Sequence, residues 1–336
     1  MKCMVTGATG FIGNSLVKEL LNRNVTVHVF VRSKQRLDAE IMNHVAVFEG
    51  GLNESHVLDA AMKGCDSVFH LAGSTVIWSK EKTLAERINV EGTRNVLDAS
   101  VRNHIKKVVY TSTAGTMPPS SNDKPVDENA PDPQVYLTDY EYSKRRAELV
   151  CAGYAEKGLD VVIVNPTRVY GPGLLNKSNS VTILIKKYIQ GAWRFIPGDG
   201  SQTGNYVYIG DVVQGHLLAL EKGRPGERYI LGGENISLKS LFNMIAEACG
   251  KKYTLFPVPL FAMAAFSNVE LFLADWFGKP PLITPAWFKR YNQNRLVSSM
   301  KAKKELGYHF TPLTVGLKET ITWLNSNNNL DGNNSN

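Results

Sequence analysis

A tyrosine and a lysine four residues apart, Tyr140 and Lys144, have the types and spacing of a proton-transfer pair. In a helix this spacing places both side chains on one face, with Cβ atoms about 5–6 Å apart. A free tyrosine has a pKa of ~10, so acid–base work near neutral pH requires roughly 4 kcal/mol of preferential stabilisation of the phenolate. A neighbouring ammonium supplies the right sign of charge. We predict that Tyr140 is a general acid and that Tyr142 points elsewhere; the alternative is a surface pair.

A group of hydroxyl residues, Thr111-Ser112-Thr113, lies at the end of an apolar β-branched run over residues 107–111. If this run is a parallel strand, its carboxyl end lies at the sheet edge where ligands bind. A hydroxyl there can donate to a carbonyl oxygen as that oxygen becomes an alkoxide. The other interpretation is that these residues only form a turn.

The chain begins MKCMVTGATGFIG, an apolar run followed by Gly7, Gly10 and Gly13 and then by an amphipathic stretch over residues 14–21. Gly7 permits a tight turn, Gly10 allows close approach of a pyrophosphate, and Gly13 allows close packing of the helix. The N–H groups of the first helical turn then face the phosphates. A second strand over residues 25–31 completes a βαβ unit, which favours a dinucleotide site over a bare turn.

The end of the second predicted strand indicates which dinucleotide binds. Dehydrogenases that prefer NAD usually carry Asp or Glu there, whereas this chain has Arg32 followed by Ser33 and no acid before Asp38. A guanidinium can bind a 2′-phosphate with two hydrogen bonds. We predict NADP as the cofactor, with NAD as the alternative if Arg32 is only a solvated charge.

Short β-branched runs alternate with amphipathic helices over the first half of the chain, as in a parallel sheet covered on both faces. The further strands are expected at residues 45–49, 67–71, 107–111 and 160–164, and the further helices at 56–62, 84–102 and 140–157. Right-handed crossovers wind these six strands into one sheet. We predict an α/β fold: a Rossmann doubly wound parallel sheet with a smaller, mostly helical C-terminal substrate lobe.

The predicted domain boundaries follow the point where the alternation loosens. Residues 1–170 plus 203–232 form the dinucleotide-binding Rossmann domain, 171–202 plus 233–325 form the substrate-binding lobe, and 326–336 form a disordered tail. Helix N-termini are expected at Ser237, Thr284 and Thr311. The lobe would close over the cofactor at the carboxyl ends of the strands.

The most apolar stretch, residues 257–277, invites a membrane hypothesis. Asn268, Glu270 and Asp275 interrupt it, and a membrane span needs about 20 predominantly apolar residues. We therefore expect a buried or amphipathic helix and no stable membrane insertion; interfacial contact is the alternative.

Composition excludes several classes of function. The net charge of +7 comes from scattered basic doublets such as Lys186-Lys187 and Lys289-Arg290, which indicate a solvated surface rather than a nucleic-acid partner. The four cysteines are far apart, so we expect reduced thiols and no metal site. No cleavable apolar segment precedes the first strand, which predicts a cytoplasmic protein.

Ordered motifs along residues 1–325 carry a family resemblance: TGATGFIG, FHLAG, NVEGTRNVL, YTSTAGT, YEYSK, NPTRVYGPG, NYVYIGDVVQGHLLAL and GERYILGGEN. The chain resembles the extended short-chain dehydrogenase/reductase (NAD-dependent epimerase/dehydratase) family, in its dihydroflavonol-reductase-like and 3β-hydroxysteroid-dehydrogenase-like branch. The resemblance implies Tyr140 as acid/base and Lys144 as the residue that lowers its pKa and holds the nicotinamide ribose. It implies Thr113 where serine is usual, with Ser112 as the fallback, and Asn89 as the asparagine that shapes the site.

With this resemblance, the candidate cofactor-binding residues are Gly7, Thr9, Gly10, Phe11, Ile12, Gly13, Arg32, Leu52, Leu71, Ala72, Gly73, Tyr140, Lys144, Pro166, Thr167 and Val169.

Two departures from the family pattern are informative. Residues 50–53 lack the acid that relatives often use to meet the adenine, so recognition there would fall to backbone groups. Sugar-nucleotide epimerases usually carry an arginine for the diphosphate where this chain has Gly204, although Arg168 or Arg194 could substitute. The sequence thus favours an NADP-dependent oxidoreductase that interconverts a ketone or aldehyde and an alcohol on a mainly apolar small molecule. The alternative is a sugar-nucleotide epimerase or dehydratase; a homodimer is left open.

Overall fold

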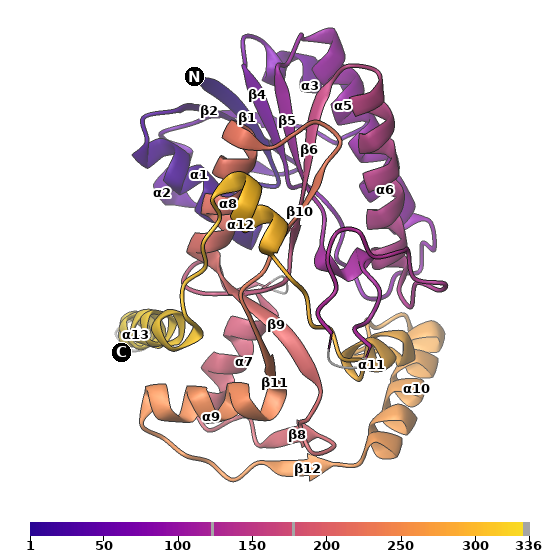
Figure 1. The fold of residues 1–336 in the computed structure, drawn as a ribbon, viewed down its shortest axis with the longest axis vertical. Helices are drawn as coiled ribbons and strands as arrows, with labels where there is room; N and C mark the ends of the chain where they lie inside the picture. Colours follow the sequence, from indigo (N-terminus) through magenta and orange to yellow (C-terminus); the bar gives the residue numbers. More distant parts are fainter. Residues whose placement is uncertain (122–123, 177–178, 332–336) are drawn as a thin grey trace.

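A parallel sheet of seven strands forms the centre of the molecule (Figure 1). The computed structural model describes residues 1–121, 124–176 and 179–331. The strands are β1 (Lys2–Thr6), β2 (Thr26–Val31), β3 (Ala46–Glu49), β4 (Ser67–His70), β5 (Lys107–Thr111), β6 (Asp160–Pro166) and β10 (Arg228–Leu231). They are ordered β10-β6-β5-β4-β1-β2-β3, with every neighbouring pair parallel. The predicted Rossmann fold, with its first six strands in one sheet, is confirmed.

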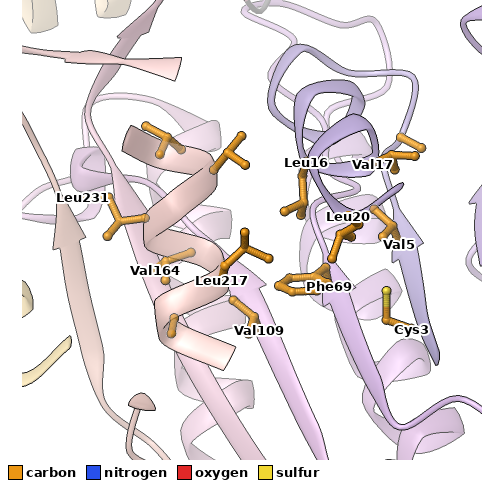
Figure 2. Packing of buried hydrophobic residues seen from close by; sticks show 14 of the residues in the cluster. Cys3, Val5, Leu16, Val17, Leu20, Phe69, Val109, Val164, Leu217 and Leu231 are labelled. Atoms are coloured by element: carbon orange, nitrogen blue, oxygen red, sulfur yellow. The ribbon is translucent and has the colours of Figure 1, made fainter. Parts of the chain in front are cut away.

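Two helical layers cover the sheet, one on each face. One core packs the sheet against α1 (Phe11–Asn22), α8 (Ile209–Lys222) and α12 (Met300–Leu306). Figure 2 shows this core, in which Leu16 and Leu20 of α1 and Leu217 of α8 meet Phe69 and Val109 of the sheet. The other core packs α3 (Ser55–Met62), α5 (Gly92–Arg102) and α6 (Asp139–Glu156). Strands buried on both faces explain why their sequences are continuous apolar runs.

A second region lies beyond the carboxyl ends of the strands (Figure 1). It holds a three-stranded sheet in the order β11-β9-β7 and a two-stranded one in which β12 pairs with β8. Its elements are β7 (Arg168–Tyr170), α7 (Ser180–Ile189), β8 (Phe195–Pro197), β9 (Thr203–Tyr208), β11 (Glu234–Ser237), α9 (Leu238–Cys249), β12 (Phe256–Val258), α10 (Leu260–Phe277), α11 (Pro285–Tyr291) and α13 (Leu313–Asp331). The helical C-terminal region is confirmed. The segment 203–232, which was assigned to the Rossmann domain from the sequence, contains strands of both regions: β10 joins the central sheet, whereas β9 pairs with β7 and β11.

Two of the three predicted capping residues, Ser237 and Thr284, cap a helix, whereas the hydroxyl of Thr311 donates to Asp211 instead. The hydroxyl of Ser237 accepts from the N–H of Ser240, and that of Thr284 accepts from the N–H of Trp287. Helix α13 begins two residues after Thr311 and runs to Asp331. The tail predicted for 326–336 therefore starts inside a helix, and residues 332–336 lie outside the described part of the chain.

The helix predicted over residues 84–102 contains a change of winding. A short α-helical turn, α4 (Leu84–Glu86), leads into a π-helical segment over Arg87–Glu91 before α5 begins. The wider turn contains Asn89, which is fully buried. Such segments concentrate at functional sites, because they re-aim one side chain without ending the helix.

Helix α10 contradicts the expectation of a buried or amphipathic helix. Of its 18 residues only Ser267 and Ala274 are buried. Its mean hydropathy reaches 1.3, and large apolar side chains such as Phe261 and Trp276 are more than 70% exposed. Length and composition make it the one candidate membrane span among the described residues. Apolar composition predicted a helix here correctly, but it could not show that the rest of the chain leaves it uncovered.

A buried histidine ties the central sheet to α8. His216 is inaccessible to solvent, and its Nδ1 lies 2.7 Å from the carbonyl of Val212, which can only accept. The proton is therefore on Nδ1, and Nε2 accepts from the hydroxyl of Thr111 at 2.8 Å. Burial lowers the pKa of His216 to about 4. The last residue of β5 is thus held by a neutral imidazole.

The buried His216 should make stability depend on pH. Its unfolded-state pKa of 6.5 exceeds the folded value, so the unfolded chain binds the extra proton. Stability is then full above about pH 6.5 and falls as pH drops toward about 4, by up to roughly 3 kcal/mol from this group. We predict that His216→Gln lowers the unfolding free energy at pH 7 but flattens its decline below pH 6.5, as measured by chemical denaturation.

The matched control is His309→Gln, at an exposed position. It should leave the pH profile of the wild type unchanged. An identical decline in wild type and His216→Gln would contradict the assignment.

Candidate active site

The sequence-predicted site residues gather at the carboxyl edge of the central sheet. The turn after β1 and the start of α1 contain six of them: Gly7, Thr9, Gly10, Phe11, Ile12 and Gly13. Others follow the ends of the next strands: Arg32 follows β2, Leu52 follows β3, Leu71, Ala72 and Gly73 follow β4, Thr113 follows β5, and Pro166 ends β6 and is followed by Thr167 and Val169. The remaining three come from helices: Asn89 from the π-helical segment, and Tyr140 and Lys144 from α6. Adjacent parallel strands end at one edge, so segments far apart in sequence meet there.

The glycine turn leaves the start of α1 open. Gly7 has φ of +77°, and a Cβ there would lie 2.7 Å from the backbone nitrogen of Ala72. A Cβ on Gly13 would lie 2.2 Å from the carbonyl oxygen of Gly7, so the helix packs directly on the turn. Gly10 precedes the helix, and no side chain caps it. Uncapped N–H groups at a helix N-terminus are suited to the phosphates of a dinucleotide.

A buried relay of hydrogen bonds holds the segment that faces this turn. The hydroxyl of Thr6 accepts from the N–H groups of Leu71 and Ala72, both at 3.1 Å. The same hydroxyl lies 2.7 Å from Nδ1 of His70, and Nε2 of His70 lies 3.1 Å from the hydroxyl of Thr93. The single hydroxyl hydrogen of Thr93 is donated to the carbonyl of Asn89, so Thr93 can only accept from His70. His70 therefore carries its proton on Nε2, and its Nδ1 accepts from the hydroxyl of Thr6. Burial lowers the pKa of His70 to about 3, so it stays neutral.

Asn89 uses its whole amide to position backbone. Its Oδ1 accepts from the N–H of Ser74 at 2.7 Å, and its Nδ2 donates to the carbonyl of Ser74 and to the hydroxyl of Ser143. The role implied by the family resemblance, that of shaping the site, agrees with these contacts.

Lys144 places a buried ammonium beneath the end of β4. Its Nζ donates to the carbonyl of Thr111 at 2.7 Å and to the hydroxyl of Tyr110 at 3.1 Å. A Cβ on Gly73 would lie 3.4 Å from this nitrogen. Burial lowers the pKa of Lys144 to about 8. A cation is therefore fixed at the sheet edge by two oxygens of β5.

Tyr140 lies one turn earlier on α6 and is partly buried. Its ring stacks on Trp287 of α11, with centroids 6.3 Å apart and an interplanar angle of 21°. Burial raises the pKa of Tyr140, opposed by a hydrogen bond with Thr113 and by the charge of Arg290. The sequence predicted a lowered pKa under the influence of Lys144, whereas in this structure the pKa is raised and the strongest opposing charge is that of Arg290. Lys144 is drawn instead to β5. A phenol kept protonated is the form that a general acid requires.

The two candidate hydroxyls after β5 point to different partners. Thr113 is extended and accepts from the N–H of Gly115 at 3.1 Å, and its hydroxyl is close enough to Tyr140 to oppose the rise in the pKa of that phenol. Ser112 donates to the carboxylate of Glu148 at 2.5 Å in the core. Thr113 is therefore the hydroxyl that shares a site with Tyr140. Tyr142 is 51% exposed and points away, as predicted.

The environment of Arg32 matches an open site for a charged ligand group. Arg32 is exposed directly after β2. Asp38, the first acid beyond it, is engaged elsewhere: it pairs with Lys18 at 3.0 Å and accepts from Asn14. No carboxylate within residues 32–37 competes for the arginine.

Three residues around Tyr140 were not identified from the sequence. Arg290 was interpreted as part of a solvated doublet, but its side chain is only 13% exposed and its Nε donates to the buried carboxylate of Glu141. Arg295 reaches the same carboxylate at 3.3 Å. Trp287 supplies the ring beneath Tyr140. All three arrive from the C-terminal region by tertiary packing, so no local pattern indicates them.

Comparisons with known proteins agree on the family. The model of the NAD dependent epimerase/dehydratase family matches residues 3–232. Cinnamoyl-CoA reductase 2 of Medicago truncatula is 31% identical over 350 residues, covering 97% of this chain and 92% of that protein. The structure of gox2253 is 31% identical with a TM-score of 0.80, covering 97% and 98%. UDP-glucose 4-epimerase of Thermotoga maritima, solved with UDP-glucose, has a TM-score of 0.79 at 24% identity, covering 97% and 99%; this likeness concerns the fold alone.

The close packing of Gly13 generates a stability prediction. Alanine normally stabilises a helix interior by ~1 kcal/mol relative to glycine. At Gly13 the added Cβ would meet backbone at 2.2 Å, so we predict that Gly13→Ala destabilises by ~1–3 kcal/mol and weakens dinucleotide binding. Gly153 of α6, whose Cβ would meet nothing within 4 Å, is the control and should gain stability as alanine. Denaturation midpoints that rise in both variants would disprove the close contact.

Proposed function

The chain belongs to the NAD dependent epimerase/dehydratase family and is an NAD(P)-dependent enzyme, and from this premise we propose that it interconverts a ketone or aldehyde and an alcohol on a mainly apolar substrate. The observation that carries this proposal is the placement of Tyr140, which stacks on Trp287 and lies one turn before the buried Lys144 at the carboxyl edge of the sheet; burial raises the pKa of Tyr140 and so favours the protonated phenol. Aromatic rings beside the phenol favour an apolar substrate body.

We propose NADP as the cofactor. The uncapped N-terminus of α1 would hold its phosphates, Lys144 its nicotinamide ribose, and Arg32 its 2′-phosphate. When bound, the cofactor supplies the hydride in the reductive direction.

The protein's own residues would orient the substrate and move the proton. The hydroxyls of Tyr140 and Thr113 donate to the carbonyl oxygen and hold it in place. As the carbonyl carbon gains the hydride, the oxygen takes the proton of Tyr140 and becomes the alcohol hydroxyl. The resulting phenolate is stabilised by the charge of Arg290. In the oxidative direction the same phenolate accepts the proton.

One observation favours the alternative, a sugar-nucleotide epimerase or dehydratase. A Cβ on Gly204 would lie 2.3 Å from Nη1 of Arg168, so this guanidinium fills the space above the glycine. Of the two arginines that could substitute for the one the epimerases carry, this contact supports Arg168 over Arg194. Cytoplasmic location, a homodimer and the absence of stable membrane insertion stay predictions.

The assignment of Tyr140 is tested by removing its hydroxyl. We predict that Tyr140→Phe lowers the rate of NADPH oxidation with a ketone substrate by at least ~100-fold, because only the proton transfer is lost. The dissociation constant for NADPH, measured by fluorescence titration, should be nearly unchanged. Tyr142→Phe is the matched control on the same helix and should behave as wild type. Retention of most of the rate in Tyr140→Phe would refute the role.

The choice of cofactor is tested at Arg32. Charge-assisted hydrogen bonds contribute ~1.5–3 kcal/mol, so Arg32→Ala should raise the dissociation constant for NADPH by roughly tenfold or more and leave that for NADH little changed. Arg36→Ala, another exposed arginine just beyond it, is the control. Wild-type protein that binds NADH as tightly as NADPH would show that Arg32 does not select the cofactor.

A further inference from the structure

Helix α10 exposes a continuous apolar face at the outer edge of the molecule (Figure 1). Phe261, Phe272 and Trp276 recur at helical spacing, so their side chains lie on one side of the helix. They are 79%, 62% and 73% exposed, and the rings of Phe272 and Trp276 stack with centroids 5.9 Å apart. Soluble proteins rarely expose a contiguous apolar surface of this kind unless it is an interaction site.

Both acidic residues of α10 lie outside this apolar face and are bound by the protein. The carboxylate of Glu270 accepts from the N–H of Leu282 at 2.8 Å. The carboxylate of Asp275 accepts from the indole N–H of Trp78, also at 2.8 Å. The first of these bonds holds Leu282, which is 80% exposed, beside the helix. Within α10 the apolar face therefore carries no charge that would oppose its transfer into an apolar medium.

Two exposed lysines lie at the C-terminal end of α10. Lys279 follows the helix directly, and a Cβ on Gly278, the C-cap residue, would contact Nζ of Lys80. Glu81, the acid next to Lys80, is engaged elsewhere, because it pairs with Arg87 at 2.9 Å. The chain as a whole carries a net charge of +7. An apolar face with positive charge at its end is complementary to a surface of anionic lipid.

The opposite side of α10 fixes the helix to the protein. Ser267 and Ala274 are buried there, and the helix packs against α11. To span a bilayer, α10 would have to leave α11 and take Glu270 and Asp275 into hydrocarbon, which is costly. A helix that lies in the membrane interface instead buries only its apolar side, to a depth of about 5–10 Å. Tryptophan and lysine are both suited to the level of the lipid headgroups.

We propose that α10 binds the surface of an anionic lipid bilayer, with its apolar face among the headgroups and Lys80 and Lys279 against the lipid phosphates. The proposal does not depend on the proposed function, but it bears on how an apolar substrate arrives. Trp287 of α11, the helix on which α10 packs, stacks on Tyr140. A bilayer bound at α10 therefore adjoins the part of the protein that faces the catalytic phenol.

The test measures binding of the full-length protein to vesicles. The probes are large unilamellar vesicles of phosphatidylcholine alone and of equal parts phosphatidylcholine and phosphatidylglycerol, with the bound fraction measured by flotation. We expect the mixed vesicles to be bound at least about tenfold more tightly than the neutral ones, because two lysines lie close to the negative surface.

A first pair of variants tests the apolar face. Phe272→Gln combined with Trp276→Gln should weaken binding to the mixed vesicles by about tenfold or more, because both rings lose their burial in lipid. The matched control combines Leu149→Gln of α6 with Val315→Gln of α13, which are 55% and 45% exposed, and should bind as wild type. Far-UV circular dichroism should be the same for all three proteins, since every substituted side chain is exposed.

A second pair of variants tests the charge. Lys80→Gln combined with Lys279→Gln should lower binding to the mixed vesicles by about tenfold and leave binding to phosphatidylcholine nearly unchanged. The control combines Lys157→Gln, just after α6, with Lys318→Gln of α13. It removes the same number of charges from other parts of the surface and should retain most of the binding.

Three results would overturn the proposal. The first is no binding of the wild type to either kind of vesicle. The second is vesicle binding that survives in both the aromatic and the lysine variants. The third is a wild-type dimer, seen by sedimentation equilibrium, that the aromatic variant dissociates while vesicles stay unbound, because a second copy of the chain would then cover α10. None of these results affects the proposed function, which is measured as NADPH oxidation by a ketone without vesicles.

Discussion

A row of three side chains across neighbouring strands connects the two halves of the site. Thr6, His70 and Tyr110 are in register across β1, β4 and β5. Thr6 fixes the segment after β4, His70 lies between the hydroxyls of Thr6 and Thr93, and Tyr110 accepts from Lys144. The row is buried, so each polar atom must keep its partner. The position of the ammonium relative to the glycine turn therefore depends on the register of the sheet.

The same burial that orders this row also sets the protonation states of the site. It holds His70 neutral and raises the pKa of Tyr140, whereas it lowers that of Lys144 to about 8. The site thus presents a proton donor and a cation of reduced pKa before any ligand binds. The positive charge of Arg290 acts in the same direction on the product of proton transfer, because it favours the phenolate that forms when Tyr140 gives up its proton.

The sequence predicted the parts of the molecule that follow local rules. Strands such as β5 and β6 are buried on both faces and read as continuous β-branched runs, and the glycine spacing identified the turn after β1. The placement of Thr113 beside Tyr140 came from the family resemblance, since the local sequence left Ser112 open as an alternative. Arg290 could not be predicted, since its partner Glu141 lies 149 positions away and α11 has only seven residues. The exposure of α10 also depends on tertiary packing, not on composition.

Net reduction of a carbonyl with Tyr140 as proton donor can be followed with NADPH that is deuterated at the transferable C4 position. We expect one alcohol to form per NADPH oxidised, with deuterium on the carbinol carbon. Conversion of a sugar nucleotide to its isomer, with no net oxidation of NADPH and no deuterium gained from it, would rule out net reduction and establish the epimerase alternative.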